Sequence, residues 1–285
     1  MGVVFNFPVR VFLLDTVRIM MPNRAFASCM SFGAGMLLSG FFDLQIAVLG
    51  SLMILCTYCS QAIFNNLRDM EGDVVNAPDR PLVNGTITEA FAWRLMYTLI
   101  LMGFVFAYLA SPFLIIVNTL YVFIGIIYSS YTKAKWYLSY LTLATSHIIT
   151  PLVSGYLIFG AIDERIIIIA AFLYLTEMLV WSIKDYKDVK GDAETGVMTL
   201  PVVMSPKKAS YVTCMALALP LLLVWMPWHA LQLSNSFLMI YLAAGAARLF
   251  LGTRLLNNQS PAIAAGILKN FRYVLFLQMI GWCLS

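Results

Sequence analysis

The stretch NNLRDMEGDVVNAPDRPLVNG, residues 65 to 85, places acidic, amide and arginine side chains directly after the apolar run 46–64. The charged residues in and just after this stretch are Asp69, Glu71, Asp73, Asp79 and Glu89 on the acidic side, and Arg68, Arg80 and Arg94 on the basic side. An apolar run of about 20 residues is long enough to span a bilayer as a helix. The stretch therefore predicts a helical membrane protein with a polar site where this helix ends.

The composition of the whole chain supports the same fold class. Of the 285 residues, 61% are hydrophobic and 11% are charged, against about 25% charged in an average soluble domain. Nine apolar runs predict nine membrane spans: 25–42, 46–64, 91–110, 113–131, 138–159, 166–183, 210–228, 236–251 and 271–285. We expect one all-α domain over residues 1–285, in contact with membrane lipids and without a nucleic-acid partner.

The chain ends and the cysteines add little to this outline. The first 22 residues mix Arg10, Asp15 and Arg18 with apolar residues, which predicts an amphipathic surface helix that ends at Pro22 and not a removable signal peptide. All the cysteines lie in predicted spans, so we expect them to pack as small apolar side chains. These cysteines are Cys29, Cys56, Cys59, Cys214 and Cys283.

Lysine and arginine are distributed unevenly between the two sides of the predicted bundle. With nine spans, all 18 of them except Arg165 fall before the first span, in the loops after every second span or in the span ends next to those loops. The positive-inside rule then predicts that this side, with the N-terminus, is cytoplasmic and that the C-terminus lies on the opposite side.

The opening stretch has the spacing of a metal site. If the helix continues, Asn65, Asp69 and Asp73 lie on one face at i, i+4 and i+8, with Asn66 beside them. Stacked carboxylates repel each other unless a cation lies between them. Oxygen ligands of this kind suit Mg²⁺, which completes its shell with phosphate and water.

A second acidic cluster, KDYKDVKGDAETG at residues 184–196, follows the sixth predicted span. Asp185, Asp188 and Asp192 lie at i, i+3 and i+7, again on one helix face. Such residues can be solvated loop residues, and Lys187 and Lys190 could simply be their ion-pair partners. Two matching clusters on one side instead favour tandem four-helix halves, about 1–135 and 136–255, followed by a ninth helix. Between them the clusters could hold Mg²⁺ around a diphosphate.

The two stretches resemble a known pair of motifs. The first is similar to the Asn-Asp-x-x-Asp-x-x-x-Asp signature of the UbiA superfamily of intramembrane prenyltransferases, followed by that family's Arg-Pro-Leu-x-x-Gly at residues 80–85. The second resembles the family's Asp-x-x-Asp-x-x-x-Asp, with Gly196 and residues 199–201 also in pattern. Asn66 departs from the pattern, because many members carry Asp there. An amide oxygen can still bind Mg²⁺ but brings no charge.

The resemblance implies a fold and an activity. It implies nine helices around a central cavity that opens sideways to lipid, and Mg²⁺-dependent transfer of an isoprenoid from an allylic prenyl diphosphate to a lipophilic acceptor. Such chemistry is physically reasonable here, because cations stabilise the charge that develops on a leaving diphosphate. Asp69, Asp73, Asp188 and Asp192 are then expected to be catalytic.

The resemblance also implies a Tyr-x-x-x-Lys element after the fourth span. Tyr131 and Lys135 match its spacing best, with Tyr128 and Lys133 as neighbours. We expect this element to bind the diphosphate, although tyrosines and lysines are also common at membrane interfaces.

Four other polar residues are candidates for substrate binding. Arg18 and Asn23 flank Pro22, where the family usually has Arg-Pro with a nearby Asn, and Arg68 could reach the diphosphate or pair with its acidic neighbours. Glu177 lies within a span, which is costly unless it faces a cavity or a partner. At 100° per residue it projects within about 20° of Asp188, so we expect it in the same cavity, or else protonated against another helix.

His147 is a weaker cavity candidate, since a lone histidine on an apolar helix more often packs through hydrogen bonds. The sequence leaves open an intramembrane terpene cyclase with the same ionisation step, because an acceptor pocket has no motif. A cation-coupled transporter is less well supported, since transporters bind their ions near the midplane of the membrane.

Overall fold

The computed structural model describes residues 9–285, and their regular secondary structure is helical apart from one isolated bridge between Lys135 and Met198. The N-terminal part contains α1 (Val9–Met20), α2 (Pro22–Leu38), α3 (Leu44–Arg68), α4 (Met70–Asn76), α5 (Glu89–Ala110), α6 (Pro112–Ile127) and the π-helix η1 (Tyr128–Thr132). The C-terminal part contains α7 (Trp136–Ala144), the π-helix η2 (Thr145–Ile149), α8 (Thr150–Leu157), α9 (Glu164–Glu177), the 3₁₀-helix η3 (Leu179–Lys187), α10 (Val189–Glu194), α11 (Leu200–Met204), α12 (Pro206–Leu223), α13 (Trp225–Ala230), α14 (Asn235–Asn257) and α15 (Pro261–Cys283).

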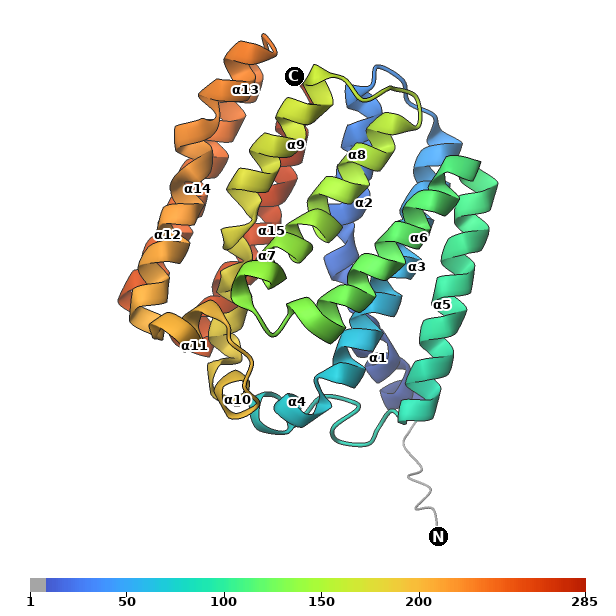
Figure 1. Cartoon of the computed structure of the whole chain (residues 1–285), viewed down its shortest axis with the longest axis vertical. Coiled ribbons are helices and arrows are strands. Elements are labelled where there is room, and N and C mark those ends of the chain that lie inside the picture. Colours follow the sequence, from blue (N-terminus) through green and yellow to red (C-terminus); the bar gives the residue numbers. More distant parts are fainter. Residues whose placement is uncertain (1–8) are drawn as a thin grey trace.

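The long helices run up and down in one bundle, and the short helices α4, α10 and α11 lie together at one of its ends (Figure 1). The N-terminal helix α1 lies at this same end, and the C-terminus lies at the other. Short polar side chains start several of the long helices: Asp43, Thr88, Asp163, Ser234 and Ser260 each accept a hydrogen bond from the backbone N–H three residues later.

The all-helical membrane fold is confirmed, but the count of nine spans is not. In the part of the chain that the structure describes, seven helices are long and apolar enough to cross a membrane. The first predicted span is the 17-residue helix α2. The fifth is divided among α7, η2 and α8, and the ninth begins at Pro261 instead of 271. The predicted surface helix is present as α1 from Val9, and its first eight residues lie outside the described range.

The centre of the bundle is held by close helix crossings. A Cβ on Gly35 of α2 would lie 2.0 Å from the carbonyl oxygen of Leu152 in α8, and one on Gly155 would lie 2.1 Å from that of Phe32. Small residues allow helix backbones to approach this closely within a membrane. The crossing joins the N-terminal and C-terminal parts; the proposed tandem origin of these halves stays a prediction. The five cysteines are free thiols, and Cys283 is exposed.

Candidate active site

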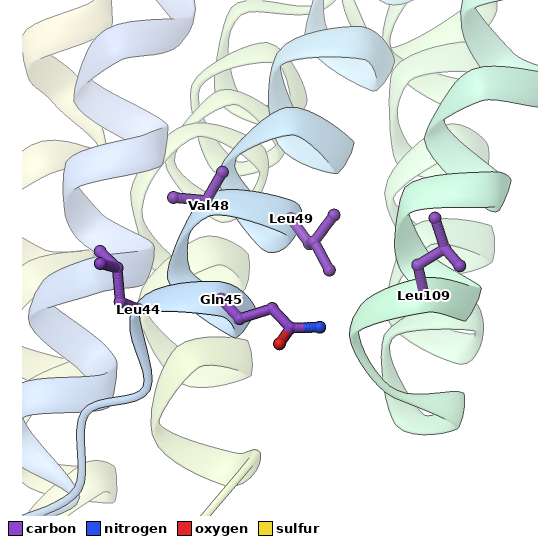
Figure 2. Close-up of a pocket in the computed structure, with 5 residues that line it drawn as sticks. All are labelled: Leu44, Gln45, Val48, Leu49 and Leu109. Carbon is purple, nitrogen blue, oxygen red and sulfur yellow. The ribbon is translucent and has the colours of Figure 1, made fainter.

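The two acidic motifs lie at the same end of the bundle, on elements that contact each other. The first runs from the end of α3 into α4, and the second from η3 into α10, which packs against α4 (Figure 1). A surface groove lined by Leu44, Gln45, Val48, Leu49 and Leu109 lies at the other ends of α3 and α5 (Figure 2). That groove is therefore separate from the acidic motifs.

The first motif keeps helical spacing although α3 ends at Arg68. The backbone N–H of Asp69 donates to Asn65 O at 3.0 Å, and that of Asp73 donates to Asp69 O at 2.9 Å. Both bonds span four residues, so the three side chains share a face as predicted. The Asn65 amide donates to Asp69 Oδ2 at 2.7 Å. Asn66 is buried and its amide donates to the carbonyls of Ile19 and Ala62, which ties α3 to α1.

Basic side chains contact both carboxylates of the first motif. Lys133 forms an ion pair with Asp69, and Arg80 forms one with Asp73. Arg80 also donates to Asn66 Oδ1 at 3.4 Å. Sequence reasoning treated Arg80 only as part of a family pattern. Its contact with Asp73, seven residues earlier, depends on the fold of the loop after α4, which no helical spacing predicts.

The second motif is only partly free to bind a ligand. The Asp185 carboxylate accepts from Tyr140 Oη at 2.5 Å and from Lys184 Nζ at 2.6 Å, and it is 2% exposed. Asp188 is half-buried, and Asp192 is buried within electrostatic range of both other aspartates. Tyr140 was not singled out from the sequence, since it lies in an apolar run 45 residues before its partner.

Asn76 directly joins the two motifs. Its amide donates to Asp188 O at 3.1 Å, and its oxygen accepts from the backbone N–H of Gly191 at 2.8 Å. Glycine at 191 leaves room for this contact, because a Cβ there would lie 2.3 Å from Asn76 Nδ2. This contact was not predicted, although Asn76 lies inside the first quoted stretch.

The structure gives the two lysines after the fourth predicted span different surroundings. Lys133 is largely buried against Asp69 and lies in electrostatic range of Tyr128 and Lys184, whereas Tyr131 is 73% exposed and Lys135 is also exposed. The cause is the π-helix η1, in which the Lys133 N–H donates to Tyr128 O, five residues earlier, at 2.9 Å. Tyr128 also lies under Lys184, whose Nζ is 5.9 Å from the ring centroid.

The candidate residues near α1 lie at the edge of this arrangement. Arg18 pairs with Asp15 at 3.1 Å and with Asp79 at 3.0 Å, so it attaches α1 to the loop after α4. Asn23 and Arg68 are exposed. Arg24, which the sequence analysis passed over, lies within electrostatic range of Lys187 and His147.

Glu177 and His147 have protein partners. Glu177 is 2% exposed and pairs with the fully buried Arg248 of α14, which the charge distribution had grouped with the loop after the eighth predicted span. The predicted alignment of Glu177 with Asp188 fails because residues 179–187 form a 3₁₀-helix, which turns 120° per residue instead of 100°. The His147 ring lies 5.2 Å from Tyr58 and 4.8 Å from Trp181, between ring centroids, within an aromatic cluster.

Burial and charge crowding act on the acidic side chains. Burial, followed by the neighbouring Asp185 and Asp188, raises the pKa of Asp192 to about 7. Burial also raises the pKa of Asp73 to about 6, although Arg80 opposes this shift. Among residues 9–285, no three Asp, Glu, His or Cys side chains converge as a metal site. The donors instead suit ions held by one or two carboxylates and completed by phosphate and water, as is usual for Mg²⁺.

Fold and site together define a helical integral membrane protein with two acidic motifs, and basic side chains paired with them, at one end of its bundle. A family model described as the UbiA prenyltransferase family matches residues 26–277, and the chain belongs to this family. It is therefore a prenyltransferase by class.

Similar proteins extend over most of the chain. A digeranylgeranylglyceryl phosphate synthase from Methanococcus aeolicus is 26% identical over 96% of this chain and 97% of its own. One from Methanothrix thermoacetophila is 30% identical over 70% and 76%. A UbiA homolog from Archaeoglobus fulgidus bound to DMAPP and Mg²⁺ has a TM-score of 0.68 at 19% identity, covering 94% of this chain and 97% of that one.

Proposed function

We propose that this protein transfers an isoprenoid chain from an allylic prenyl diphosphate to a lipophilic acceptor and releases diphosphate in a Mg²⁺-dependent reaction. The observation that carries the proposal is the docking of two aspartate motifs through Asn76, with Lys133, Arg80 and Lys184 among the carboxylates. Oxygen ligands beside fixed cations suit a diphosphate with its metal ions.

Each group has a distinct role in this proposal. Asp69 and Asp73 on one side, and Asp188 and Asp192 on the other, would hold Mg²⁺, with the amide oxygens of Asn65 and Asn66 nearby. When bound, Mg²⁺ neutralises charge on the leaving diphosphate. Asp185 is tied to Tyr140 and Lys184, so we assign it to orienting Lys184 more than to direct metal contact.

The protein side chains support the bond changes. The allylic carbon–oxygen bond breaks, the diphosphate leaves, and an acceptor atom forms the new carbon bond and loses its proton. Lys133 and Lys184 would bind the diphosphate oxygens as negative charge develops on them. The Tyr128 ring, close to Lys184, would face the allylic carbon end and stabilise positive charge there.

The names of the relatives suggest the first acceptor to test. Because the similar archaeal proteins are digeranylgeranylglyceryl phosphate synthases, a prenylated glycerol phosphate heads the acceptor panel. Aromatic acceptors belong in the same panel. The prenyl donors bound in the A. fulgidus structures, DMAPP and GPP, provide two of the donors, and longer chains complete the series.

The test is diphosphate release by purified protein from each allylic diphosphate, with and without Mg²⁺, followed by mass spectrometry of the lipid extract. Mg²⁺-dependent release with a prenylated acceptor supports the proposal. Release with only a cyclised product would instead establish the terpene cyclase, and ion flux without release from any donor would favour the transporter.

Variants of the motifs sharpen this test. We predict that Asp69→Ala or Asp188→Ala lowers turnover by at least about 100-fold, because several kcal/mol of charge stabilisation is lost. Both proteins should stay folded in detergent, since neither residue belongs to the packed core. Glu71→Gln, which changes an exposed carboxylate of α4, is the matched control and should keep near-normal turnover. Near-normal turnover of either alanine variant would contradict the metal assignment.

A further inference from the structure

A buried arginine in α14 contacts the helix that leads into the second acidic motif. Arg248 is 0% exposed. It pairs with Glu177, donates to Gln278 Oε1 at 3.2 Å and donates through Nη2 to the backbone carbonyl of Thr176 at 2.9 Å. Its guanidinium carbon also lies 5.0 Å from the centroid of the Phe271 ring. Arg248 thus links α9, α14 and α15 in the interior of the bundle.

The contacted carbonyl lies where the helix changes type. The N–H of Met178 donates to Tyr174 O, four residues earlier, at 3.1 Å, and the 3₁₀-helix η3 begins at Leu179. In a continuous α-helix, Thr176 O would accept from the N–H of Val180. In this structure Thr176 O accepts from Arg248, and a side chain that inserts into the backbone ladder is a recognised cause of helix distortion.

The change of helix type alters where the motif points. The η3 helix has nine residues, whereas 3₁₀ runs longer than three or four residues are uncommon. Each residue turns about 20° more than in an α-helix, so the direction of Asp185 differs by about 120° from that of an uninterrupted α-helix. The observed direction brings Asp185 to Tyr140 at 2.5 Å.

We propose that Arg248 is a positioning residue for the second acidic motif. By holding Thr176 O, it maintains the 3₁₀ geometry that places Lys184 and Asp185 toward Tyr128 and Tyr140, and Asp188 and Asp192 toward the first motif. Glu177 balances the charge of Arg248 so that the guanidinium can remain buried. The inference deepens the proposed function and rests on it, because the motif it positions is the proposed metal site.

The test needs variants that do not leave a single buried charge. Removing one partner of a buried pair is strongly destabilising, whereas replacing both with apolar residues is often neutral or stabilising. The double variant Glu177→Met/Arg248→Met therefore removes the carbonyl contact without an unpaired charge. The matched control Gln278→Met removes a neutral acceptor of Arg248 and leaves both the pair with Glu177 and the bond to Thr176 O in place.

Two measurements are made on each protein: the Mg²⁺ concentration for half-maximal diphosphate release, and the binding of Mn²⁺ by electron paramagnetic resonance with inorganic diphosphate present. We expect the double variant to remain folded in detergent and to require at least about tenfold more of either metal, while Gln278→Met stays within about threefold of wild type. Wild-type metal dependence of the double variant would overturn the inference. An equal loss in Gln278→Met would also overturn it, because the bond to Thr176 O is intact in that variant.

The two proposals fail in different ways. Wild-type protein that binds Mn²⁺ but releases no diphosphate from any donor would overturn the proposed function alone. Wild-type protein that neither binds Mn²⁺ nor releases diphosphate would overturn both. A double variant that loses thermal stability but keeps the Mn²⁺ affinity of the wild type would show that Arg248 only supports packing, which also contradicts the inference.

Discussion

Lys133 and Lys135 are two residues apart, yet the structure gives them different surroundings. Lys133 is paired with Asp69, whereas Lys135 is exposed and takes part in the backbone bridge to Met198. We therefore predict that Lys133→Met lowers turnover by about 100-fold, as for loss of a charge-stabilising donor. Lys135→Met should change it by no more than about twofold, as for an ordinary surface substitution. The measurement is diphosphate release at saturating Mg²⁺.

The family spacing favours the opposite result, since Lys135 is the better match to the Tyr-x-x-x-Lys element. A greater loss in Lys135→Met than in Lys133→Met would show that the π-helix η1 does not persist when the diphosphate binds. Equal, small effects would remove this segment from the proposed site.

The raised pKa values of Asp73 and Asp192 predict a pH dependence. Burial keeps both carboxyls protonated to higher pH than usual, with pKa values of about 6 and about 7. Below these values Mg²⁺ must displace protons. The Mg²⁺ concentration for half-maximal release should thus rise as pH falls. Protonation of Asp192 alone should raise it about tenfold between pH 8 and pH 6. A Mg²⁺ concentration for half-maximal release that does not vary with pH would mean that neither carboxyl binds the metal in its ionised form.

Among the individual residues of the site, the acidic residues could be predicted from the sequence, but their contact partners could not. Two regularly spaced acidic clusters next to apolar runs are visible in any helical projection. Arg80, Lys133 and Tyr140 reach the aspartates across a loop, a π-helix and another helix, respectively. Their positions depend on tertiary packing, for which single-sequence periodicity has no signal.

Among the elements, α4 and α10 carry the direct connection between the motifs. Gly191→Ala would place a methyl group 2.3 Å from the Asn76 amide nitrogen. The Asn76 side chain can rotate away at little cost in stability, but both of its bonds to the second motif are then lost. We predict a fall in turnover of about 10- to 100-fold, as for small misplacements of catalytic groups, with thermal stability nearly unchanged.

The control for this substitution is Gly33→Ala, because a Cβ at Gly33 has no atom within 4 Å. It should preserve both turnover and stability. If Gly191→Ala also preserves turnover, the two motifs do not need the Asn76 contact to act together.

The helices themselves were well predicted where they are regular. Apolar runs gave the approximate position of most long helices, because burial in lipid demands a continuous apolar segment. The π-helix η2 and the 3₁₀-helix η3 were missed. Irregular turns of this kind arise from contacts such as that between Arg248 and Thr176 O, which join residues 72 positions apart.

For the whole molecule, the difference between nine predicted and seven continuous spans has a physical source. The α2 helix needs only 17 residues in its close packing against α8, and the fifth predicted span contains η2. Both segments are apolar enough for a hydropathy pattern, but α2 is short and the fifth predicted span is interrupted by a π-helix. A hydropathy pattern indicates that a segment lies in an apolar environment, but it does not indicate that the segment forms one uninterrupted helix.

The distribution of charge predicts the orientation of the whole bundle. The end with α4, α10 and α11 carries Arg80, Lys190 and Lys208, whereas the other end carries Arg165 beside the acidic Asp163 and Glu164. Arg248 is buried and must be left out of such a count, but the asymmetry remains without it. By the positive-inside rule, we predict that the end with the acidic motifs faces the cytoplasm.

Labelling of single exposed positions measures this orientation. In a Cys283→Ser background, which removes the exposed native thiol, Glu164→Cys should react with a membrane-impermeant maleimide in intact cells. Glu71→Cys, on the exposed side of α4, should react only after the membrane is permeabilised. The background without either new cysteine is the control for residual labelling of Cys29. The reverse pattern would place the acidic motifs outside the cell, where a donor diphosphate made in the cytoplasm could not reach them without crossing the membrane.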